Sequence, residues 1–365
     1  MNKDRPVRWR RALLLAALAP IGWLLQFACS FVPELTERIY SRGVYPKIRH
    51  VLNAVAQLSP IAIGETLLLI AVGWALVRVM RGGLAWRRRL RSLRNLLAHA
   101  VAKTLAIGGV LFLLFQAMWA LNHARLPFAT QVGLQTRPVG RAELIDVVRK
   151  LAVRAAAIRP EGLDPLHGLP GHDYRAAVAA AYARAGTECA ALRGPAPVIR
   201  EPLISPLMTL ASITGIYSPF TAEANVDGEV PRVVLPFTAA HEVAHQRGYA
   251  REDEANFIAW WVGSRSDDPL LAYSCELCAW RTALAQLAAV DGMAYFEERG
   301  AAPKAIRDDD RAIRDFWLGR PKAVTQVLTK ITSTTNDVYL RSSGHKEGVE
   351  SYDRMVDLLI AALCP

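Results

Sequence analysis

The chain has 365 residues, 52% of them hydrophobic, which is enough for one or two domains with a sizeable core. Its formal net charge of +11 is uneven: residues 1–125 hold 18 Lys and Arg against 4 Asp and Glu, whereas the remainder holds 26 against 29. Because the positive charge flanks long apolar runs, it indicates a membrane protein and argues against a nucleic-acid partner.

Three apolar runs near the N-terminus are long enough to cross a lipid bilayer, which takes about 20 helical residues. We expect spans at about residues 12–33, 59–78 and 104–122, within a membrane domain over residues 1–123. No convincing small-x-small cleavage site follows the first run, so we expect a retained span and not a signal peptide. Glu65 lies near the outer end of the second span, where a solvated or paired structural role is expected.

Positive charge also predicts the orientation of the spans. Lys3, Arg5, Arg8, Arg10 and Arg11 precede the first span, and six arginines between residues 81 and 94 separate the second from the third. Such segments stay in the cytoplasm. The N-terminus is therefore expected inside, with residues 34–58 and the domain 124–365 outside the cytoplasm.

The external domain contains four cysteines. Disulfides persist outside the cytoplasm, but the sequence does not choose among the three possible pairings. Cys275 and Cys278 have the spacing of a redox motif, yet they lie in a helical pattern without a second pair, so we interpret them as structural. The other two are Cys189 and Cys364.

The pattern of residues 124–365 predicts a mainly helical fold with a small β element. Helical periodicity covers 141–158 and 173–192, and later 238–247 and 251–262, with three or four more helices in 269–363. The run 198–200 is extended, and residues 203–230 combine loop and short strand. Val233-Val234-Leu235 has the pattern of a strand that ends at Pro236.

The residues that carry chemistry are His241-Glu242-Val243-Ala244-His245. Two histidines four apart lie on one helical face and can bind the same zinc ion. The Glu between them can take a proton from a water molecule that the zinc ion activates. Pro236 and Thr238 predict a helix start just before this motif, and Gly248 predicts its end.

The third ligand is expected on the helix that follows. Glu252 and Asn256 share a face, so Glu252 would bind zinc and Asn256 would hydrogen-bond the far nitrogen of one histidine. Glu254 remains the alternate ligand. Asp253 is expected only to complement the helix dipole.

A peptidase also needs an edge strand for its substrate and a donor for the oxyanion. Residues 232–235 are the candidate edge strand, and residues 215–220 are a candidate wall of the cleft. Side chains that could donate to the developing charge are Tyr217, Tyr339, Arg341, His345 and Tyr352.

Several stretches resemble the DUF3810 family of bacterial membrane proteins, which has an HExxH motif and no assigned function. The matching stretches are residues 40–46, 63–65, 119–122, 215–226, 235–250, 252–257 and 351–357. The resemblance covers nearly the whole chain and implies a zincin-like, zinc-peptidase-like domain anchored in the bacterial cytoplasmic membrane. The run Glu252-Asp253-Glu254-Ala255-Asn256 also looks like the third-ligand helix of gluzincin peptidases, which favours Glu252 as ligand.

These observations lead to one main hypothesis. The chain is expected to be a membrane-anchored zinc metalloendopeptidase that hydrolyses proteins or peptides outside the cytoplasm, with Glu242 as general base and His241, His245 and Glu252 as zinc ligands. The alternative is a non-catalytic membrane protein that uses the zinc site for structure or for binding a partner. An intramembrane protease is disfavoured, because arginines and acidic residues surround the motif.

Overall fold

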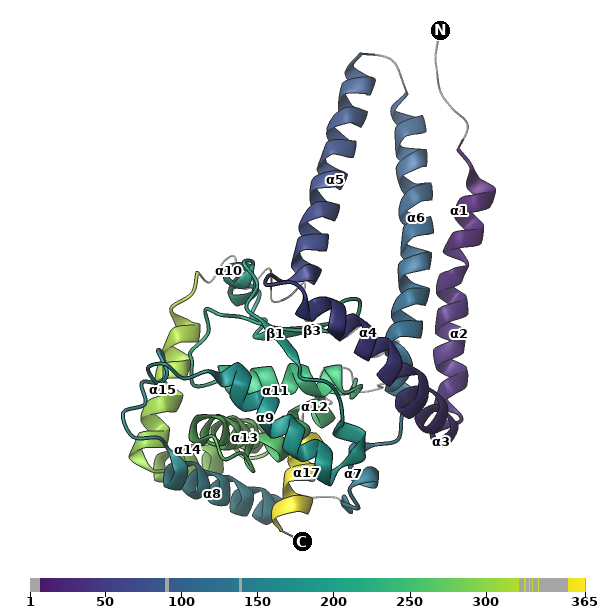
Figure 1. Ribbon diagram of the computed structural model, residues 1–365. Helices are drawn as coiled ribbons and strands as arrows, with labels where there is room; N and C mark the ends of the chain where they lie inside the picture. The colour runs from purple at the N-terminus through teal and green to yellow at the C-terminus, as the bar shows by residue number, and fades with distance from the viewer. Residues whose placement is uncertain are drawn as a thin grey trace.

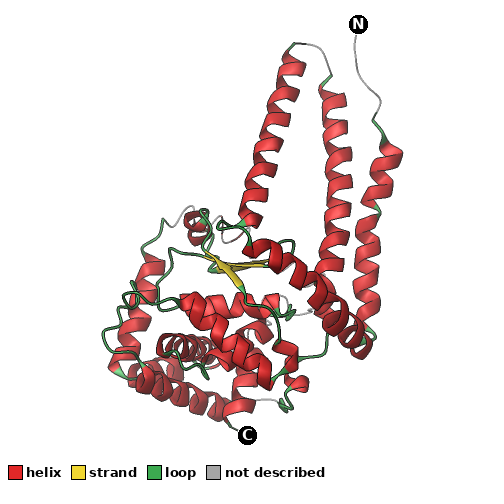
Figure 2. Ribbon diagram, viewed as in Figure 1, coloured by secondary structure: helices red, strands yellow, loops and turns green. Residues whose placement is uncertain are grey.

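The computed structural model describes residues 7–88, 92–137, 140–321 and 354–364, together with the helical positions 325, 328, 330 and 334. Within these residues the chain is mainly helical, and one small sheet lies between the long N-terminal helices and a cluster of shorter ones (Figure 2). The predicted mainly α fold with a small β element is confirmed.

Three helices near the N-terminus are long and apolar enough to cross a membrane (Figure 1). The first is made of α1 (Trp9–Ala16) and α2 (Leu18–Ser30), the second is α5 (Ile63–Arg87), and the third is α6 (Leu93–Met118). Helices α1 and α2 pack on α6, whereas no residue of α5 is buried. Both α5 and α6 extend well into the basic segment expected as a loop, because arginine is itself a good helix former.

The segment between the first and second of these helices is also helical. It contains α3 (Pro33–Thr36), the π-helix η1 (Glu37–Val44) and α4 (Tyr45–Gln57). After α6 follow the 3-10 helix η2 (Ala120–Ala124) and the short α7 (Phe128–Gln131). In Figure 1, α4 runs from the lower end of α2 to the lower end of α5.

The remaining helices form a cluster that we call the helical domain. Its core is built where α13 packs against α8 and α11, and it includes the fully buried Trp280. The predicted helix 141–158 is confirmed as α8, and the predicted helix 173–192 is divided into α9 and η3. The elements are α8 (Arg141–Ile158), α9 (Tyr174–Glu188), η3 (Ala190–Leu192), α10 (Ser205–Leu210), α11 (Leu235–Gln246), α12 (Glu252–Gly263), α13 (Pro269–Val290), α14 (Gly292–Ala301), α15 (Lys304–Leu318) and α17 (Arg354–Leu363).

The sheet has three strands in the order β1-β3-β2. The strands are β1 (Val198–Arg200), β2 (Gly215–Ser218) and β3 (Glu223–Val226). The central β3 pairs in parallel with β1 and antiparallel with β2, so that Gly215 lies opposite Val226 and Ser218 opposite Glu223. Strand β2 is thus an edge strand of this sheet.

The predicted strand 232–235 is wrong. Residues 232–234 form a turn, and Leu235 already begins α11, with Pro236 in the first helical turn. Proline is favoured there because its fixed φ suits a helix and its missing N–H is not needed. Val233 and Leu235 are apolar because both are fully buried in the core.

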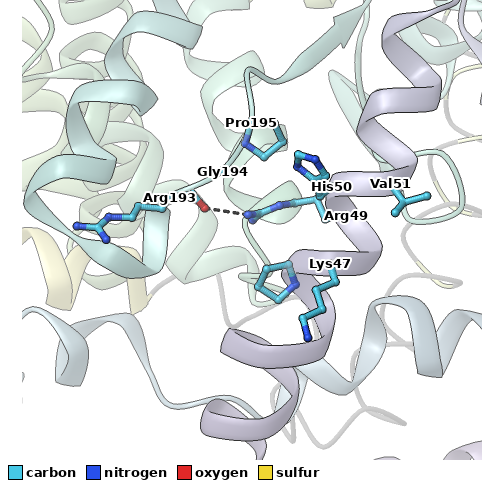
Figure 3. Close-up of a pocket in the computed structure, with 8 residues that line it drawn as sticks. Lys47, Arg49, His50, Val51, Arg193, Gly194 and Pro195 are labelled. Carbon is cyan, nitrogen blue, oxygen red and sulfur yellow. Dashed lines mark hydrogen bonds between the residues drawn. The ribbon is translucent and has the colours of Figure 1, made fainter.

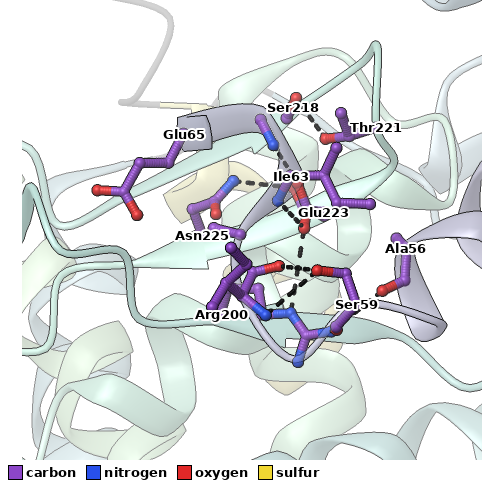
Figure 4. A network of polar contacts seen from close by, with 12 residues as sticks. Ala56, Ser59, Ile63, Glu65, Arg200, Ser218, Thr221, Glu223 and Asn225 are labelled. Atoms are coloured by element: carbon purple, nitrogen blue, oxygen red, sulfur yellow. Dashed lines mark hydrogen bonds and ion pairs between the residues drawn. The ribbon is translucent and has the colours of Figure 1, made fainter. Parts of the chain in front are cut away.

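Two carboxylates fix the lower end of α5 to the sheet and to the start of α10 (Figure 4). The buried Glu223 of β3 accepts hydrogen bonds from the backbone N–H groups of Ile63 and Gly64, both at 2.8 Å. Glu65 accepts from the N–H groups of Leu203 and Ile204 at 3.0 and 2.7 Å. The structural role expected for Glu65 is therefore confirmed.

Candidate metal centre

Helix α11 places both motif histidines on one face. The Nε2 atoms of His241 and His245 lie 3.0 Å apart, and both side chains are largely buried. The helix ends before Gly248, whose φ of +88° is a left-handed conformation that glycine adopts without strain. The chain turns back there, which brings the start of α12 to the two imidazoles.

Glu252 is the first residue of α12 and faces the histidines. Its Oε2 atom lies 3.2 Å from Nε2 of His241 and 3.6 Å from Nε2 of His245. Ligand atoms about 2.0–2.1 Å from a tetrahedral zinc ion are roughly 3.3–3.4 Å from one another. The three residues thus form a group that could hold a metal ion, and their donor set and spacing fit zinc.

The hydrogen bonds of the histidines fit the same role. Nδ1 of His245 lies 2.7 Å from the carbonyl oxygen of Tyr249, which requires the proton on Nδ1, so that the neutral form of the imidazole keeps its lone pair on Nε2. Burial disfavours a charged His245, yet the Glu252 carboxylate outweighs it and raises the pKa of His245 to about 9. The surroundings of the two imidazoles therefore favour a positive charge between them.

Asn256 forms no hydrogen bond to either histidine in the described part of the chain. The Tyr249 carbonyl takes the role that we expected of Asn256 at His245, and Nδ1 of His241 is buried without a partner among the described residues. A backbone carbonyl has no sequence signature, so this partner was not predictable.

The alternate ligand, Glu254, lies away from the imidazoles. Its carboxylate accepts a hydrogen bond of 2.6 Å from the backbone N–H of Phe128, and burial raises its pKa to about 7. Asp253 pairs with Arg251 at 3.0 Å. Of the three acids at the start of α12, only Glu252 belongs to the candidate metal group.

Glu242 lies beside these ligands under strand β2. Its side chain is buried, which raises its pKa, and its Oε2 atom has no hydrogen-bond partner among the described residues. A Cβ atom at Gly215 would come within 2.8 Å of Cγ of Glu242, so only glycine allows the strand this close to the carboxylate. The free oxygen can accept a proton from a small molecule at the site.

Residues from the N-terminal third cover the C-terminal end of α11. The indole N–H of Trp119 donates to the His245 carbonyl at 3.0 Å, and the hydroxyl of Tyr45 donates to the Gln246 carbonyl at 2.7 Å. The Trp119 ring also meets the His245 ring edge-on, with centroids 6.0 Å apart. We did not predict these contacts, although both residues lie in stretches that carry the family resemblance.

Tyr217 is the one oxyanion candidate within the described residues. Its hydroxyl lies 3.3 Å from that of Tyr45. Because Tyr45 donates its only hydroxyl proton to Gln246, Tyr217 is the donor in the contact between the two tyrosines. Its proton is therefore already in use. The candidates Tyr339, Arg341, His345 and Tyr352 lie outside the described residues.

The five cysteines are all described, and each is a free thiol. Cys275 is buried in α13, and burial raises its thiol pKa well above the ordinary value. It is therefore a poor nucleophile, which agrees with the structural interpretation of the Cys275–Cys278 pair.

Comparison with known proteins gives one match. The family described as "Protein of unknown function (DUF3810)" matches residues 40–360. None of the curated proteins and none of the solved structures matches this chain.

Proposed function

The chain belongs to the DUF3810 family, whose function is unknown, and we propose that it is a membrane-anchored zinc-dependent metallopeptidase. The single observation that carries the proposal is the convergence of His241, His245 and Glu252 beside a carboxylate oxygen of Glu242 that has no hydrogen-bond partner in the described part of the chain. A purely structural zinc site normally has four protein ligands and needs no base.

In this proposal His241, His245 and Glu252 hold zinc, and a fourth position stays open for water. A bound zinc ion would lower the pKa of that water toward neutrality. Glu242 would accept the proton and later pass it to the leaving amine. Its burial supports this role, because a raised pKa makes the carboxylate a stronger base than an exposed one.

Strand β2 is the proposed binding edge for an extended peptide. It is the edge strand next to the motif helix and replaces residues 232–235 in this role. An added strand would gain backbone hydrogen bonds along β2, which give affinity with little dependence on side chains. The exposed Ile216 would contact substrate side chains.

Helices α1–α2, α5 and α6 would anchor the enzyme in the bacterial cytoplasmic membrane, with the N-terminus inside. The arginines at the ends of α5 and α6 that lie away from the helical domain support this orientation. The catalytic domain would then face the outside of that membrane and act on protein or peptide substrates there.

The test is the variant Glu242→Gln in the full-length protein. It should keep about one zinc ion per chain and lose peptide hydrolysis by at least ~1,000-fold, because it removes the base and no ligand. Metal content and cleavage of a peptide library would be measured together. Equal hydrolysis by both proteins would refute the proposal, and zinc binding without hydrolysis by the wild type would indicate a non-catalytic metal site.

A further inference from the structure

Helix α4 is amphipathic, but its polar side is buried and its apolar side is exposed, which is the reverse of an ordinary surface helix. Its polar residues Arg49 and Asn53 are buried against the helical domain, and Tyr45 is buried beside them. The opposite side carries an exposed apolar stripe, with exposed fractions of 45, 62, 52 and 86%. We call this stripe the outer face of α4; it consists of Val44, which precedes the helix, Val51 and Val55 within it, and Leu58, which follows it.

The polar side is held by specific contacts, so the helix cannot rotate to hide the stripe. Arg49 donates to the carbonyl of Arg193 at 2.8 Å (Figure 3). Asn53 donates to the carbonyl of Ala196 at 2.9 Å and accepts from the side chain of Gln246 at 3.2 Å. Exposing the outer face to water would cost the free energy of four large apolar side chains.

We infer that the outer face of α4 lies in the membrane interface, and that the metal centre acts on polypeptides close to where they leave the bilayer. The occupant of the face is lipid because α4 belongs, with α3 and η1, to the segment that connects two helices that are apolar enough to span a membrane. The apolar surface also continues into Ile61, just before α5. The second part of the inference rests on the proposed function, and the first does not.

Basic residues flank the outer face, as they do on helices that lie at the level of the lipid headgroups. A shallow groove of about 540 Å³ lies between α4 and residues 193–195. Lys47, His50 and Arg193 line it together with Val51 of the outer face (Figure 3). An apolar stripe bordered by cations is the arrangement of helices that lie in the plane of a membrane surface.

The position of α4 fixes how far the metal centre lies from lipid. Tyr45 contacts the carbonyl of Gln246, the residue after the ligand His245, so α4 is the layer between the end of α11 and the bilayer. One to two helix diameters correspond to about 10–20 Å. An extended chain covers that distance in about 3–6 residues.

The first experiment needs no activity. A photoreactive diazirine amino acid is placed at Val51, Val55 or Leu58 in the full-length protein in phospholipid vesicles. The controls are His50 and Gln57, which are exposed but lie next to residues 193–196 of the helical domain. The outer-face positions should crosslink to phospholipid at least fivefold more than the controls. Equal lipid crosslinking, or crosslinks mainly to a second copy of the chain, would overturn the inference.

The second experiment tests the substrate class. A peptide sequence that the wild-type protein cleaves is fused after a transmembrane helix through a spacer of 6 or 60 residues, and both fusions are co-reconstituted with the enzyme. The extension of a flexible spacer grows as the square root of its length, so a tenfold shorter spacer keeps the peptide in a layer about threefold thinner at the membrane surface, and the short fusion should be cleaved about threefold faster. Equal rates would overturn the inference and leave the peptidase proposal intact. Failure to cleave any peptide faster than Glu242→Gln would instead remove the proposed function.

Discussion

At the scale of single residues, the start of α12 determines which acid joins the metal group. Glu252 is the first residue of the helix and faces the imidazoles, whereas Glu254 is bonded to Phe128. Loss of a residue that hydrogen-bonds to a metal ligand typically lowers metal affinity about 10–100-fold. Glu252→Gln would remove a proposed ligand itself, so we expect it to lower zinc affinity by more than ~100-fold. Competition with a chelator of known affinity measures this.

Glu254→Gln is the matched control, because the amide oxygen can still accept the hydrogen bond from Phe128. Its zinc affinity should stay within about tenfold of the wild type, a smaller change than the loss of a residue that hydrogen-bonds to a metal ligand would cause. The reverse result, with Glu254→Gln the weaker binder, would assign the third ligand to Glu254.

Gly215 controls the position of the proposed base. In Gly215→Ala the new methyl group would meet Cγ and Cδ of Glu242 at 2.8 and 2.9 Å, so strand and carboxylate must separate. Misplacement of a reacting group by about 1 Å costs on the order of 100-fold in rate. We therefore expect kcat to fall about 10- to 100-fold with zinc content unchanged.

Gly292→Ala serves as the control for this substitution, since nothing lies within 4 Å of a Cβ atom there. Its kcat should equal that of the wild type. A Gly215→Ala protein with full activity would show that the close approach of β2 to Glu242 has no role in catalysis.

The residues of the candidate metal group were the most predictable, because i, i+4 spacing alone places two histidines on one face. Glu252 followed from the glycine turn and its spacing to Asn256. The contacts of Tyr249, Trp119 and Tyr45 were not predictable, since they depend on a backbone carbonyl and on residues up to about 200 positions away.

At the scale of elements, a buried ion pair joins η1 to the turn after α11. Arg125 donates to both oxygens of Glu37 and to the carbonyls of Arg247 and Gly248. Glu37→Gln leaves the Arg125 charge without its partner, which should cost about 3–5 kcal/mol. The thermal midpoint of the full-length protein should fall accordingly.

This loss should depend on pH. Burial alone would raise the pKa of Glu37, but the hydrogen-bonded Arg125 outweighs it and holds that pKa below its ordinary value. A lowered folded-state pKa stabilises the protein above the unfolded pKa of about 4.3, and the contribution disappears as pH falls through the folded value. The difference in midpoint should therefore be constant above about pH 5 and shrink below about pH 4.

Arg42→Ala is the control, because Arg42 pairs with the same Glu37 but is half exposed. An exposed partner contributes less than about 1 kcal/mol. A Glu37→Gln protein whose midpoint matches that of Arg42→Ala at neutral pH would contradict the importance of the buried pair.

At this scale the helices were predicted well, and the extended run predicted at 198–200 is confirmed as β1; the error is the strand predicted at 232–235. The predicted helices at 141–158 and 251–262 agree with α8 and α12 to within a residue at each end, because their apolar periodicity is regular. The run Val233-Val234-Leu235 led to a wrong strand prediction, because β-branched residues also occur in a buried turn and in the first turn of a helix. The reversed amphipathicity of α4 has no local signature at all, because only its distant partners show which side is buried.

At the scale of the whole molecule, the helical domain depends on the N-terminal third. A fragment of residues 124–365 would lack the hydrogen bonds from Trp119, Tyr45 and Arg49 to the end of α11. Three such bonds contribute about 1 kcal/mol each. The thermal midpoint of the fragment should lie roughly 6–12 °C below that of the full-length protein.

The fragment should also bind zinc more weakly than the full-length protein, because the turn between His245 and Glu252 loses its support. Scanning calorimetry and metal content of both proteins check this prediction. An isolated fragment with the midpoint and zinc content of the intact chain would show that the two parts fold independently.

The sequence predicted the order of parts along the chain, three apolar helices and then a helical domain with its motif. It did not predict their contact, because the contact combines buried polar groups of α4 and Trp119 with a small apolar cluster in which Tyr45, Trp119 and Leu121 pack with Ala250. Hydropathy alone therefore suggested a boundary at residue 123 where the structure has a shared surface.

The capping of α11 by residues 45–125 has a consequence for biosynthesis. Every side chain from outside the helical domain that bonds its last carbonyls comes from an earlier part of the chain, among the described residues. A ribosome makes those groups first. During synthesis, the side chains that bond the C-terminal end of α11 are therefore present before α11 and its two histidines are made.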